Sequence, residues 1–597
     1  MIKVSDYVAS FLEEKKIKDI FTLSGGICFP LLESIGKSKI NHVCNLHEQA
    51  VAVGAEAYAQ YTDQPGVCVV TAGPGATNTI TGIASAWLDS IPMIVFSGQV
   101  QSKDIKGNKK VRQIGFQEID IVSIVKPITK MATTVLDPYN IKKTLEIAWH
   151  TATTGRQGPV WIEIPLDIQS AQIDETKLEG LPPLHDQKTD ELLLKTKVFD
   201  FYNLLSNSKR PIILVGNGVR SSKAIDSFLK LAEKLSIPVL TTWKSLDFMD
   251  EDHPLFVGRP GLIAQRGANF SQQTADLFIS IGARMDHGQT AFNHQNFARK
   301  AKKVIIDIDK AEIDIMQFEK DCIIYCDAKE FIEEALCSIY PSYKGTKKFD
   351  TWLEQCKTWQ KKYPVILPEY WEETEGVNYY VLIDVLSKLM KPTDLLIPGS
   401  SGCSSEVTMQ AFKVKKGMRI FNSEGLGSMG FGIAAAIGGC IASNKHTICL
   451  DGDGGFIMNV QELETVKRLN LNIKFFVLNN GGYVSIRNSQ KKHFELEIAS
   501  SETSGVTLPN FSKIANAFNI KYTKIDSHSN IEENVQKVLN EEGPIICEVI
   551  MPHSQESFPR NSTYKKEDGS FISLPMEDLL PLLDRDEFNE NMKIAND

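Results

Sequence analysis

The sequence predicts an α/β protein of three serial, doubly wound parallel-sheet domains. At 597 residues the chain exceeds what one hydrophobic core supports. Short apolar runs rich in Val and Ile alternate with longer amphipathic segments, which is typical of parallel strands covered by helices on both faces. This alternation restarts after two polar connecting stretches, residues 173–191 and 341–373.

The first domain is expected over residues 1–175. It opens on an amphipathic helix and has strands at DIFTLS, VCVVTA and MIVFSG, each followed by glycine or a polar turn. The strand PVWIEIP closes it, and the polar, proline-bearing segment 173–191 serves as a linker.

The middle domain is expected over residues 192–340, with strands at PIILVGNG, IPVLTTW, LFISIGA and KVIIDID. The third is expected over residues 377–550, with strands at DLLIPG, HTICLD, IKFFVLNN and PIICEVI. A C-terminal tail, residues 551–597, follows, and its segment PMEDLLPLL is expected to dock as a short helix. No short repeat of fixed period is present, so the domains are serial units and not a solenoid.

Composition narrows the class of partner. The balance of 65 Lys and Arg against 74 Asp and Glu gives a formal charge of −9, which argues against nucleic acid and favours small molecules. Eleven scattered cysteines within mostly apolar surroundings are typical of free thiols in a reducing compartment. No export signal and no stretch long enough to span a bilayer is seen, so we expect a cytoplasmic protein without a membrane partner. The glycine-rich run 430–442 is expected to form a buried helix.

Acidic, amide and glycine residues follow two apolar strands of the third domain. Asp453 ends one strand and Asn480 ends the next, with a helix expected from about Asn459 to Leu469 between them. This βαβ unit places both at one sheet edge, where a carboxylate, an amide oxygen and the Gly482 carbonyl suit Mg²⁺. Bare backbone and a helix N-terminus then suit a diphosphate, and the glycines concerned are Gly452, Gly454 and Gly455. Either piece alone is equally typical of an ordinary turn, but together they favour a cofactor site.

The pattern Gly-Asp-Gly, helix, Asn-Asn resembles the cofactor signature of thiamine-diphosphate-dependent enzymes. The run from Leu46 to Val100 is similar to the pyrimidine-binding domain of the acetolactate synthase family, the acetohydroxyacid synthase large subunits. The middle domain of that family is similar to the run from RPIILVGNG to DAKEF. Its third, diphosphate-binding domain is similar to the segment SEGLGSMGFGIAAAIGG. The resemblance covers roughly Val4 to Ile550 and implies a thiamine-diphosphate- and Mg²⁺-dependent enzyme.

By this resemblance Glu48 is the catalytic acid. It hydrogen-bonds the aminopyrimidine ring and drives the tautomer whose imino group removes the proton from the thiazolium C2. A carboxyl in an apolar setting retains its proton more readily. Without the family, Glu48 is one acid at a helix start, and the neighbouring His47 is expected only to cap that helix. Gln117, in GFQE, is placed near the reaction centre.

Further cofactor contacts are implied in the first and third domains. Met429 matches the bulky residue that holds the cofactor bent, although ordinary core packing is an equal explanation. The other contacts implied are Pro74, Asn78, Gly399, Ser400 and Gly427. In this family the acid and the metal ligands of one site come from different subunits, so a homodimer or homotetramer is implied, while the sequence does not tell whether a regulatory subunit exists.

The middle domain of the family holds FAD as a structural cofactor. Matching positions in this chain are Gly216, Gly218, Arg284 and Asp327. The segment GARMDHGQ keeps only the start of the family's arginine motif, so an empty site or another nucleotide is the alternative to a flavoprotein.

Departures from the family surround the expected acceptor. PGSSGCSS (398–405) replaces a Gln-His-Gln turn, Ile27 stands where the family has a small residue, and GGYVSIRNSQKKHFE (481–495) brings in Arg487 and a lysine pair. These changes are expected at the pocket mouth, where they favour a larger or anionic acceptor. The pattern is similar to thiamine enzymes that modify activated keto sugars for surface polysaccharides.

The predicted function is decarboxylation of a 2-oxo acid, first of all pyruvate, with carboligation of the resulting hydroxyethyl carbanion to a second carbonyl. Acetolactate is the first candidate for the product. The close alternative is acetyl transfer to a nucleotide-linked keto sugar in surface polysaccharide biosynthesis. A simple decarboxylase shares the same first steps. A noncatalytic binding paralogue is disfavoured because Glu48, Asp453 and Asn480 are all present.

Overall fold

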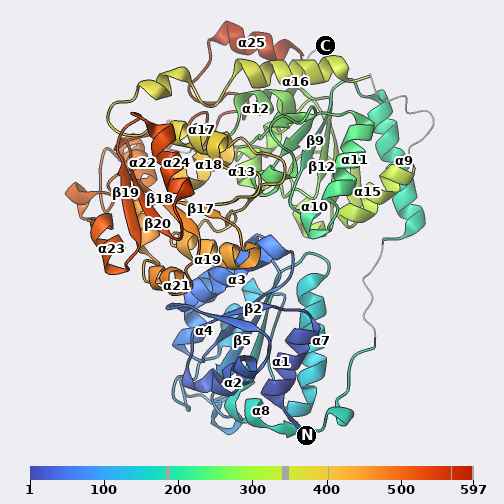
Figure 1. The fold of residues 1–597 in the computed structure, drawn as a ribbon. Coiled ribbons are helices and arrows are strands. Elements are labelled where there is room, and N and C mark those ends of the chain that lie inside the picture. Colours follow the sequence, from blue (N-terminus) through green and yellow to red (C-terminus); the bar gives the residue numbers. More distant parts are fainter. Residues whose placement is uncertain (183–188, 339–347, 401, 566–567, 570, 595–597) are drawn as a thin grey trace.

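A computed structural model describes residues 1–182, 189–338, 348–400, 402–565, 568–569 and 571–594. Four predicted segments therefore lie partly outside the described residues. They are the linker 173–191, the middle domain, the turn 398–405 and the C-terminal tail. Three six-stranded sheets, every strand pair in them parallel, form the scaffold. Figure 1 shows the three units, with the N-terminal one below and the other two side by side above it. The predicted fold class is confirmed.

The first sheet has strands of almost uniformly buried residues at its centre, as a sheet covered on both faces requires. Its spatial order is β3 Asn41–Cys44, β2 Asp19–Thr22, β4 Gly66–Val70, β5 Met93–Gln99, β7 Pro159–Pro165 and β6 Met131–Thr134. Its helices are α1 Val4–Glu14, α2 Phe29–Lys37, α3 Glu48–Thr62, α4 Pro74–Asn78, α5 Ile80–Leu88, α6 Ile121–Val125, α7 Ile141–Thr153 and α8 Leu166–Ser170.

The third sheet repeats this topology. Its order is β16 Arg419–Ile420, β15 Leu395–Pro398, β17 Thr447–Gly452, β18 Ile473–Asn479, β20 Ile545–Ile550 and β19 Lys521–Ile525. Its helices are α17 Tyr379–Leu389, α18 Cys403–Ala411, α19 Phe431–Ser443, α20 Asp453–Ile457, α21 Glu462–Arg468, α22 Val484–Phe494, α23 Phe511–Ala517 and α24 Ile531–Asn540. Numbered along each domain, both sheets run 2-1-3-4-6-5.

The middle sheet differs, because numbered along its own domain it runs 3-2-1-4-5-6, the order of dinucleotide-binding domains. Its strands are β11 Phe256–Gly258, β10 Val239–Thr241, β9 Pro211–Val215, β12 Leu277–Ile281, β13 Lys302–Asp307 and β14 Cys322–Tyr325. Its helices are α9 Glu191–Asn207, α10 Gly218–Ser221, α11 Ile225–Leu235, α12 Arg266–Thr274, α13 His287–Thr290, α14 Lys310–Asp314, α15 Ala328–Cys337 and α16 Asp350–Lys362.

Two predicted helices need correction. The helix expected from about Asn459 to Leu469 is the shorter α21, Glu462–Arg468, and a separate short helix that was not expected, α20, precedes it at Asp453–Ile457. The tail segment 575–583 is not helical but irregular, with a turn at Met576 and Glu577, and it lies on the middle domain, where Arg266 donates to the carbonyls of Leu579 and Pro581. The helix of the tail is α25, Arg585–Lys593, which lies beside α16 (Figure 1).

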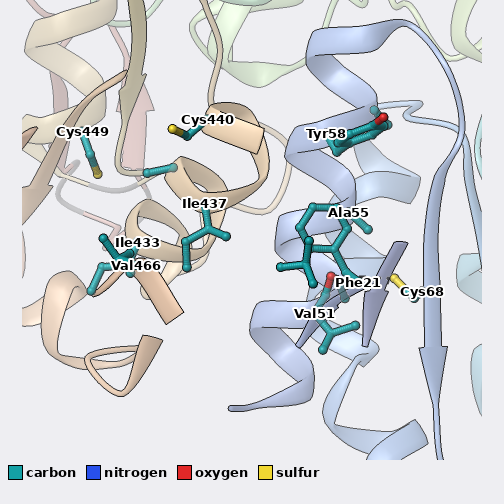
Figure 2. Packing of buried hydrophobic residues seen from close by; sticks show 14 of the residues in the cluster. Phe21, Val51, Ala55, Tyr58, Cys68, Ile433, Ile437, Cys440, Cys449 and Val466 are labelled. Atoms are coloured by element: carbon teal, nitrogen blue, oxygen red, sulfur yellow. Dashed lines mark hydrogen bonds between the residues drawn. The ribbon is translucent and has the colours of Figure 1, made fainter. Parts of the chain in front are cut away.

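The first and third domains pack through α3 and α19. Small residues let these helices approach so closely that a Cβ atom at Gly438 would lie 2.0 Å from the Gly54 carbonyl oxygen. Figure 2 shows Val51, Ala55 and Tyr58 of α3 facing the same cluster as Ile433 and Ile437 of α19. The predicted buried helix at 430–442 is therefore α19, and it belongs to a core that both domains share.

Across the described ranges of the chain, no helix combines the length and apolar character that crossing a bilayer requires.

Candidate active site

The predicted cofactor residues gather at the points where strand order reverses in the three sheets. In open parallel sheets ligands bind outside the carboxyl ends of the strands at these switch points. The reversal lies between β2 and β4 in the first sheet, between β9 and β12 in the middle, and between β15 and β17 in the third. Pro74 follows β4, Gly216 follows β9, and Asp453 follows β17.

Glu48 begins α3 and is 9% exposed. The Nδ2 of Asn78 donates to its Oε2 at 3.0 Å, and no described residue donates to its Oε1. A Cβ atom at Gly75 would lie 3.3 Å from Oε1, so this oxygen faces the turn at the start of α4, where Gly75 has no side chain. The side chain of His47 accepts from the backbone N–H of Gln49 at 3.1 Å, which confirms its predicted role as helix cap.

The backbone of Gln117 packs against the turn that carries Pro74. Gly73, directly before Pro74, has a φ of 62°, and a Cβ atom there would lie 2.5 Å from the Gln117 carbonyl oxygen. Gln117 itself has a φ of 64°, a left-handed conformation that is uncommon for a residue with a side chain. The structure thus brings Glu48, Pro74, Asn78 and Gln117 into one group at the edge of the first sheet.

Asp453, Asn480 and Gly482 form a second group at the edge of the third sheet. The Asp453 Oδ2 accepts from the backbone N–H groups of Asn480 at 3.1 Å and Gly482 at 3.0 Å. Burial raises the pKa of Asp453 to about 6, although these backbone donors oppose the rise. The Asn480 Oδ1 is buried without a hydrogen-bond partner among the described residues. An orphaned amide oxygen beside a buried carboxylate is the donor set that a hard cation completes.

The three glycines around Asp453 are bare for different reasons. A Cβ atom at Gly452 would meet nothing within 4 Å, so space remains for an approaching ligand. A Cβ atom at Gly454 would lie 2.2 Å from the Tyr483 ring, and one at Gly455 would lie 2.6 Å from the Asp451 carboxyl. Only Gly452 therefore fits the predicted reason of access for a ligand, while protein packing explains the other two.

Asp451 is a residue that the sequence reasoning passed over. Its side chain is fully enclosed, burial raises its pKa to about 7, and its Oδ2 has no partner among the described residues. Cβ atoms at Gly399 and Gly432 would lie 2.4 Å and 2.3 Å from its carboxyl oxygens. The Asp451 carboxyl thus packs tightly against the loop after β15, the start of α19 and α20. The glycines at these three places, Gly399, Gly432 and Gly455, were the signal in the sequence for a closely packed side chain.

The remaining third-domain predictions lie around the same edge. Gly427 has a φ of 62°, and a Cβ atom there would lie 3.0 Å from the Ser400 carbonyl oxygen. The Ser400 hydroxyl accepts from the backbone N–H of Ser423 at 3.0 Å. Met429 is half-buried directly before α19. Gly399, Ser400 and Gly427 are therefore together, next to the Asp453 group.

Arg487 does not lie at a pocket mouth, and the expectation that it meets an acceptor is wrong. The side chain is fully buried in α22 and donates only to backbone carbonyls, those of Asn480 at 3.1 Å, Ser500 at 3.3 Å and His553. Backbone carbonyls can satisfy a buried guanidinium in place of a carboxylate. Arg487 therefore fixes the loop that carries Asn480.

A cavity of about 600 Å³ lies where the three domains meet, and Gly216, Gly218, Arg284 and Asp327 all line it. Gly216 and Gly218 approach the backbone of Gly282 too closely for any side chain. Arg284 pairs with Asp286 at 2.8 Å and donates to the Leu88 carbonyl of the first domain. Asp327 caps α15, and burial raises its pKa.

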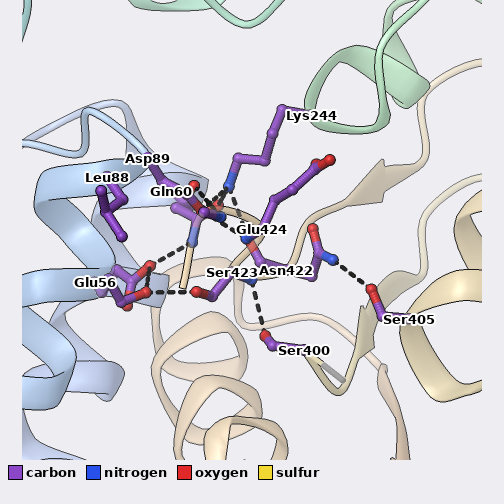
Figure 3. A network of polar contacts seen from close by, with 12 residues as sticks. Glu56, Gln60, Leu88, Asp89, Lys244, Ser400, Ser405, Asn422, Ser423 and Glu424 are labelled. Carbon is purple, nitrogen blue, oxygen red and sulfur yellow. Dashed lines mark hydrogen bonds and ion pairs between the residues drawn. The ribbon is translucent and has the colours of Figure 1, made fainter. Parts of the chain in front are cut away.

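A polar network holds the inner wall of this cavity (Figure 3). Lys244 of the middle domain pairs with Asp89 of the first at 3.1 Å and donates to the Asn422 carbonyl of the third at 2.7 Å. Glu424 lines the cavity, and burial raises its pKa to about 8, with Asp286 and Asp89 adding to the shift. One lysine thus ties all three domains together beside the cavity.

The first and third domains are also linked near the two site groups. The Glu462 carboxylate of the third domain accepts from the backbone N–H groups of Leu46 at 2.8 Å and His47 at 3.1 Å, and Arg468 donates to the Cys44 carbonyl at 2.6 Å. No hydrogen bond between described residues connects Glu48 with Asp453, Asn480 or Gly482. Among the described residues, no group of three or more His, Cys, Asp or Glu side chains could hold a metal ion.

Comparison with known proteins agrees with this geometry. Family models for thiamine pyrophosphate enzymes match as the N-terminal TPP binding domain over residues 2–124, the central domain over 200–335 and the C-terminal TPP binding domain over 400–549. The acetolactate synthase large subunit of Cyanidium caldarium is 32% identical, with 92% of this chain and 93% of that protein covered. The Lactococcus lactis acetolactate synthase large subunit is 33% identical over 93% of both chains, and the Escherichia coli isozyme 1 large subunit 29% identical over 93% and 95%.

The three family matches, one to each parallel-sheet domain, define a thiamine-pyrophosphate-dependent enzyme. Within that class, the chain belongs to the acetolactate synthase large-subunit family.

Proposed function

We propose that the enzyme decarboxylates pyruvate and joins the remaining acetyl unit to a second carbonyl, with acetolactate as the product when pyruvate is the only substrate. In the balanced reaction the C1–C2 bond of one pyruvate breaks and releases CO₂. A new carbon–carbon bond forms to the acceptor carbonyl carbon, and the acceptor oxygen takes up one proton. The observation that carries this proposal is the unpartnered Asn480 oxygen beside Asp453 at the switch point of the third sheet.

Asp453, Asn480 and the Gly482 carbonyl would hold Mg²⁺, and through it a diphosphate. Their carboxylate, amide and carbonyl oxygens suit this ion, and the open space at Gly452 lies beside them. Thiamine diphosphate, when bound, supplies the electron sink that decarboxylation needs. Met429, Gly399, Ser400 and Gly427 would contact the cofactor from the same side.

Glu48 would hold and share the proton of the pyrimidine ring. Asn78 fixes one carboxyl oxygen, so the other is oriented towards the bare Gly75 turn. Glu48 is only 9% exposed, so a pyrimidine ring at its free oxygen would meet little competing water. Gln117, held on the Pro74 turn, would position the reacting carbonyl groups.

We further infer that two chains build each site. Large apolar side chains are exposed beside both site groups, which soluble proteins otherwise cover. Phe116 is 83% exposed next to Gln117, and Met458 and Ile486 are 49% and 51% exposed next to Asp453 and Asn480. A two-fold dimer that covers these faces would bring Glu48 of one chain to Asp453 of its partner. A cytoplasmic location belongs to the proposal, since all eleven cysteines are free thiols.

FAD in the 600 Å³ cavity is part of the proposal. The middle sheet has the dinucleotide-binding order, and Gly216 and Gly218 form the turn after its first strand. The cations of the cavity wall are already paired, Arg156 with Asp309 and Glu312, Lys244 with Asp89 and Arg284 with Asp286. A diphosphate there would depend on backbone N–H groups. The visible spectrum of the purified protein tests this, because flavin absorption that survives dialysis supports FAD, and its absence after reconstitution with FAD rejects it.

The function is tested by incubating the protein with pyruvate, thiamine diphosphate and Mg²⁺, and identifying products by mass. We expect acetolactate. Acetaldehyde as the sole product would mean a simple decarboxylase, and no loss of pyruvate would reject the proposal.

A further inference from the structure

One loop of the first domain is strongly basic in an acidic protein. Between β5 and Gln117, residues 101–116 contain a single acid and five cations, while the whole chain has a formal charge of −9. No ion pair joins any of the five to a described carboxylate. The pKa of Glu118 is lowered against its burial by backbone N–H donors, and the Lys106 charge adds to this. Four of the five are exposed and Lys106 is half-buried. The cations are Lys103, Lys106, Lys109, Lys110 and Arg112.

The basic loop is anchored at both ends. Asp167 accepts from the backbone N–H of Ser102 at 2.9 Å, where the loop leaves the sheet. Glu118, which is 5% exposed, accepts from the backbone N–H groups of Lys106, of Ile114 at 2.8 Å and of Gly115 at 3.2 Å. One carboxylate therefore holds Lys106 together with Ile114 and Gly115, and three of the cations, Lys109, Lys110 and Arg112, lie on the exposed chain between these anchor points.

The basic loop also belongs to the candidate active site. It starts at the carboxyl end of β5 and ends at Phe116, directly before Gln117. Gln117 packs on Gly73 and so on the Pro74 turn. Because β4 and β5 are parallel neighbours, the loop and that turn leave the same edge of the sheet. At physiological salt a charge acts over about 8 Å, so only a ligand near this edge is affected by the loop.

We propose that the loop of residues 103–112 binds the phosphate groups of a phosphorylated or nucleotide-linked carbonyl acceptor. The inference rests on the proposed function and specifies its acceptor class. Acetolactate would form when pyruvate alone is present, and the phosphorylated carbonyl would accept the acetyl unit in the same balanced reaction when it is available.

Charge favours phosphate over a second 2-oxo acid. The loop carries a net charge of +4, from five cations and Asp104. A 2-oxo acid brings one negative charge, whereas a phosphate monoester brings about −1.5 to −2 at pH 7 and a diphosphate more. Flexible lysines bind phosphate as point charges without demanding one geometry, which suits a loop. The overall negative charge disfavours a nucleic acid as occupant.

The test measures binding and needs no turnover, so it stands whether or not pyruvate is consumed. Isothermal titration of the enzyme, saturated with thiamine diphosphate, Mg²⁺ and FAD, uses UDP and inorganic pyrophosphate as probes. The variant Lys109→Gln/Lys110→Gln is compared with Lys300→Gln/Lys302→Gln, which removes the same charge from exposed positions of the middle domain. Each is measured at about 50 mM and about 500 mM salt.

We expect both probes to bind the wild type at low salt and to weaken steeply at high salt. The loop variant should bind about five- to tenfold more weakly at low salt, and the control should match the wild type. Tighter binding of UDP than of pyrophosphate would indicate a nucleotide-linked acceptor, and equal binding a simple phosphate ester. No binding, or equal loss in both variants, would overturn the proposal.

A carbonyl pair provides a second measurement. Glyceraldehyde 3-phosphate and glyceraldehyde differ only in the phosphate group, and each is offered with pyruvate. The wild type should prefer the phosphorylated compound, and the loop variant should lose most of that preference. An unchanged ratio of kcat/KM values in the loop variant would contradict a role of the basic loop in recognising the acceptor.

Discussion

At the scale of single residues, the candidate site depends on buried polar atoms that the protein leaves partly unsatisfied. Glu48 has one oxygen bound by Asn78 and one free of described donors. Asn480 keeps an amide oxygen without a partner. Such atoms cost stability unless a ligand completes them, so each marks a position where the cofactor or its metal is expected.

Replacement of Glu48 by Gln keeps the shape of the side chain but cannot share a proton in the same way. We expect kcat for pyruvate consumption to fall by about 100-fold or more, with thiamine diphosphate still bound. Glu14→Gln, on the exposed face of α1, is the control and should match the wild type. Turnover of Glu48→Gln within twofold of the wild type would reject the role of this acid.

Glu56 makes stability depend on pH. It is buried in α3, Ser85 donates to it at 2.9 Å, and burial raises its pKa from 4.5 to about 8, with Asp89 adding to the rise. The folded state therefore favours the protonated acid, and its contribution to stability is lost as pH rises from 4.5 through 8. Glu56→Gln should melt like the wild type at pH 5 and at a higher temperature at pH 9. Identical pH dependence of the two melting temperatures would count against this assignment.

At the scale of elements, strand ends position the residues that are proposed to hold the metal. β17 and β18 are parallel neighbours whose paired residues include Gly452 and Leu478, so the residues that follow them meet at one edge. Arg487 of α22 then holds the loop after β18 through the Asn480 carbonyl. Binding of Mg²⁺ should therefore depend on this loop more than on any other.

Asn480→Ala removes the orphaned oxygen. We expect the Mg²⁺ concentration that half-saturates thiamine diphosphate binding to rise by about ten- to a hundredfold. Tryptophan fluorescence of the apoenzyme, titrated with Mg²⁺ and cofactor, measures it without turnover. Asn488→Ala, a neighbour on α22 with only a 3.4 Å contact to the Gln555 carbonyl, serves as control. Equal Mg²⁺ requirements in both variants would remove Asn480 from the ligand set.

The central strands could be predicted from sequence because their residues are apolar and buried on both faces, as in β12 and β18. Edge strands such as β3 and β19 could not, because most of their residues are at least partly exposed. The Asp453 and Asn480 pair was predictable from strand ends. Arg487 was misplaced because sequence does not show that a charged side chain finds backbone carbonyls in the interior.

At the scale of the whole molecule, the domains divide the chemistry between them. The first and third share one topology and each presents half of the proposed site, while the middle domain has the dinucleotide-binding order. Lys244 and the α3–α19 packing fix the three units to one another. No hydrogen bond between described residues joins Glu48 to Asp453, Asn480 or Gly482, which agrees with the proposal that a second copy completes each site.

Mixing two inactive variants tests this shared site most directly. Glu48→Gln and Asp453→Ala subunits are each expected to be inactive alone. In a mixed dimer one site receives the intact Glu48 of one chain and the intact Asp453 of its partner. Random association should then restore about a quarter of wild-type pyruvate turnover. If the reassembled mixture stays as inactive as either variant, although mass analysis shows mixed dimers, Glu48 and Asp453 do not meet across two chains.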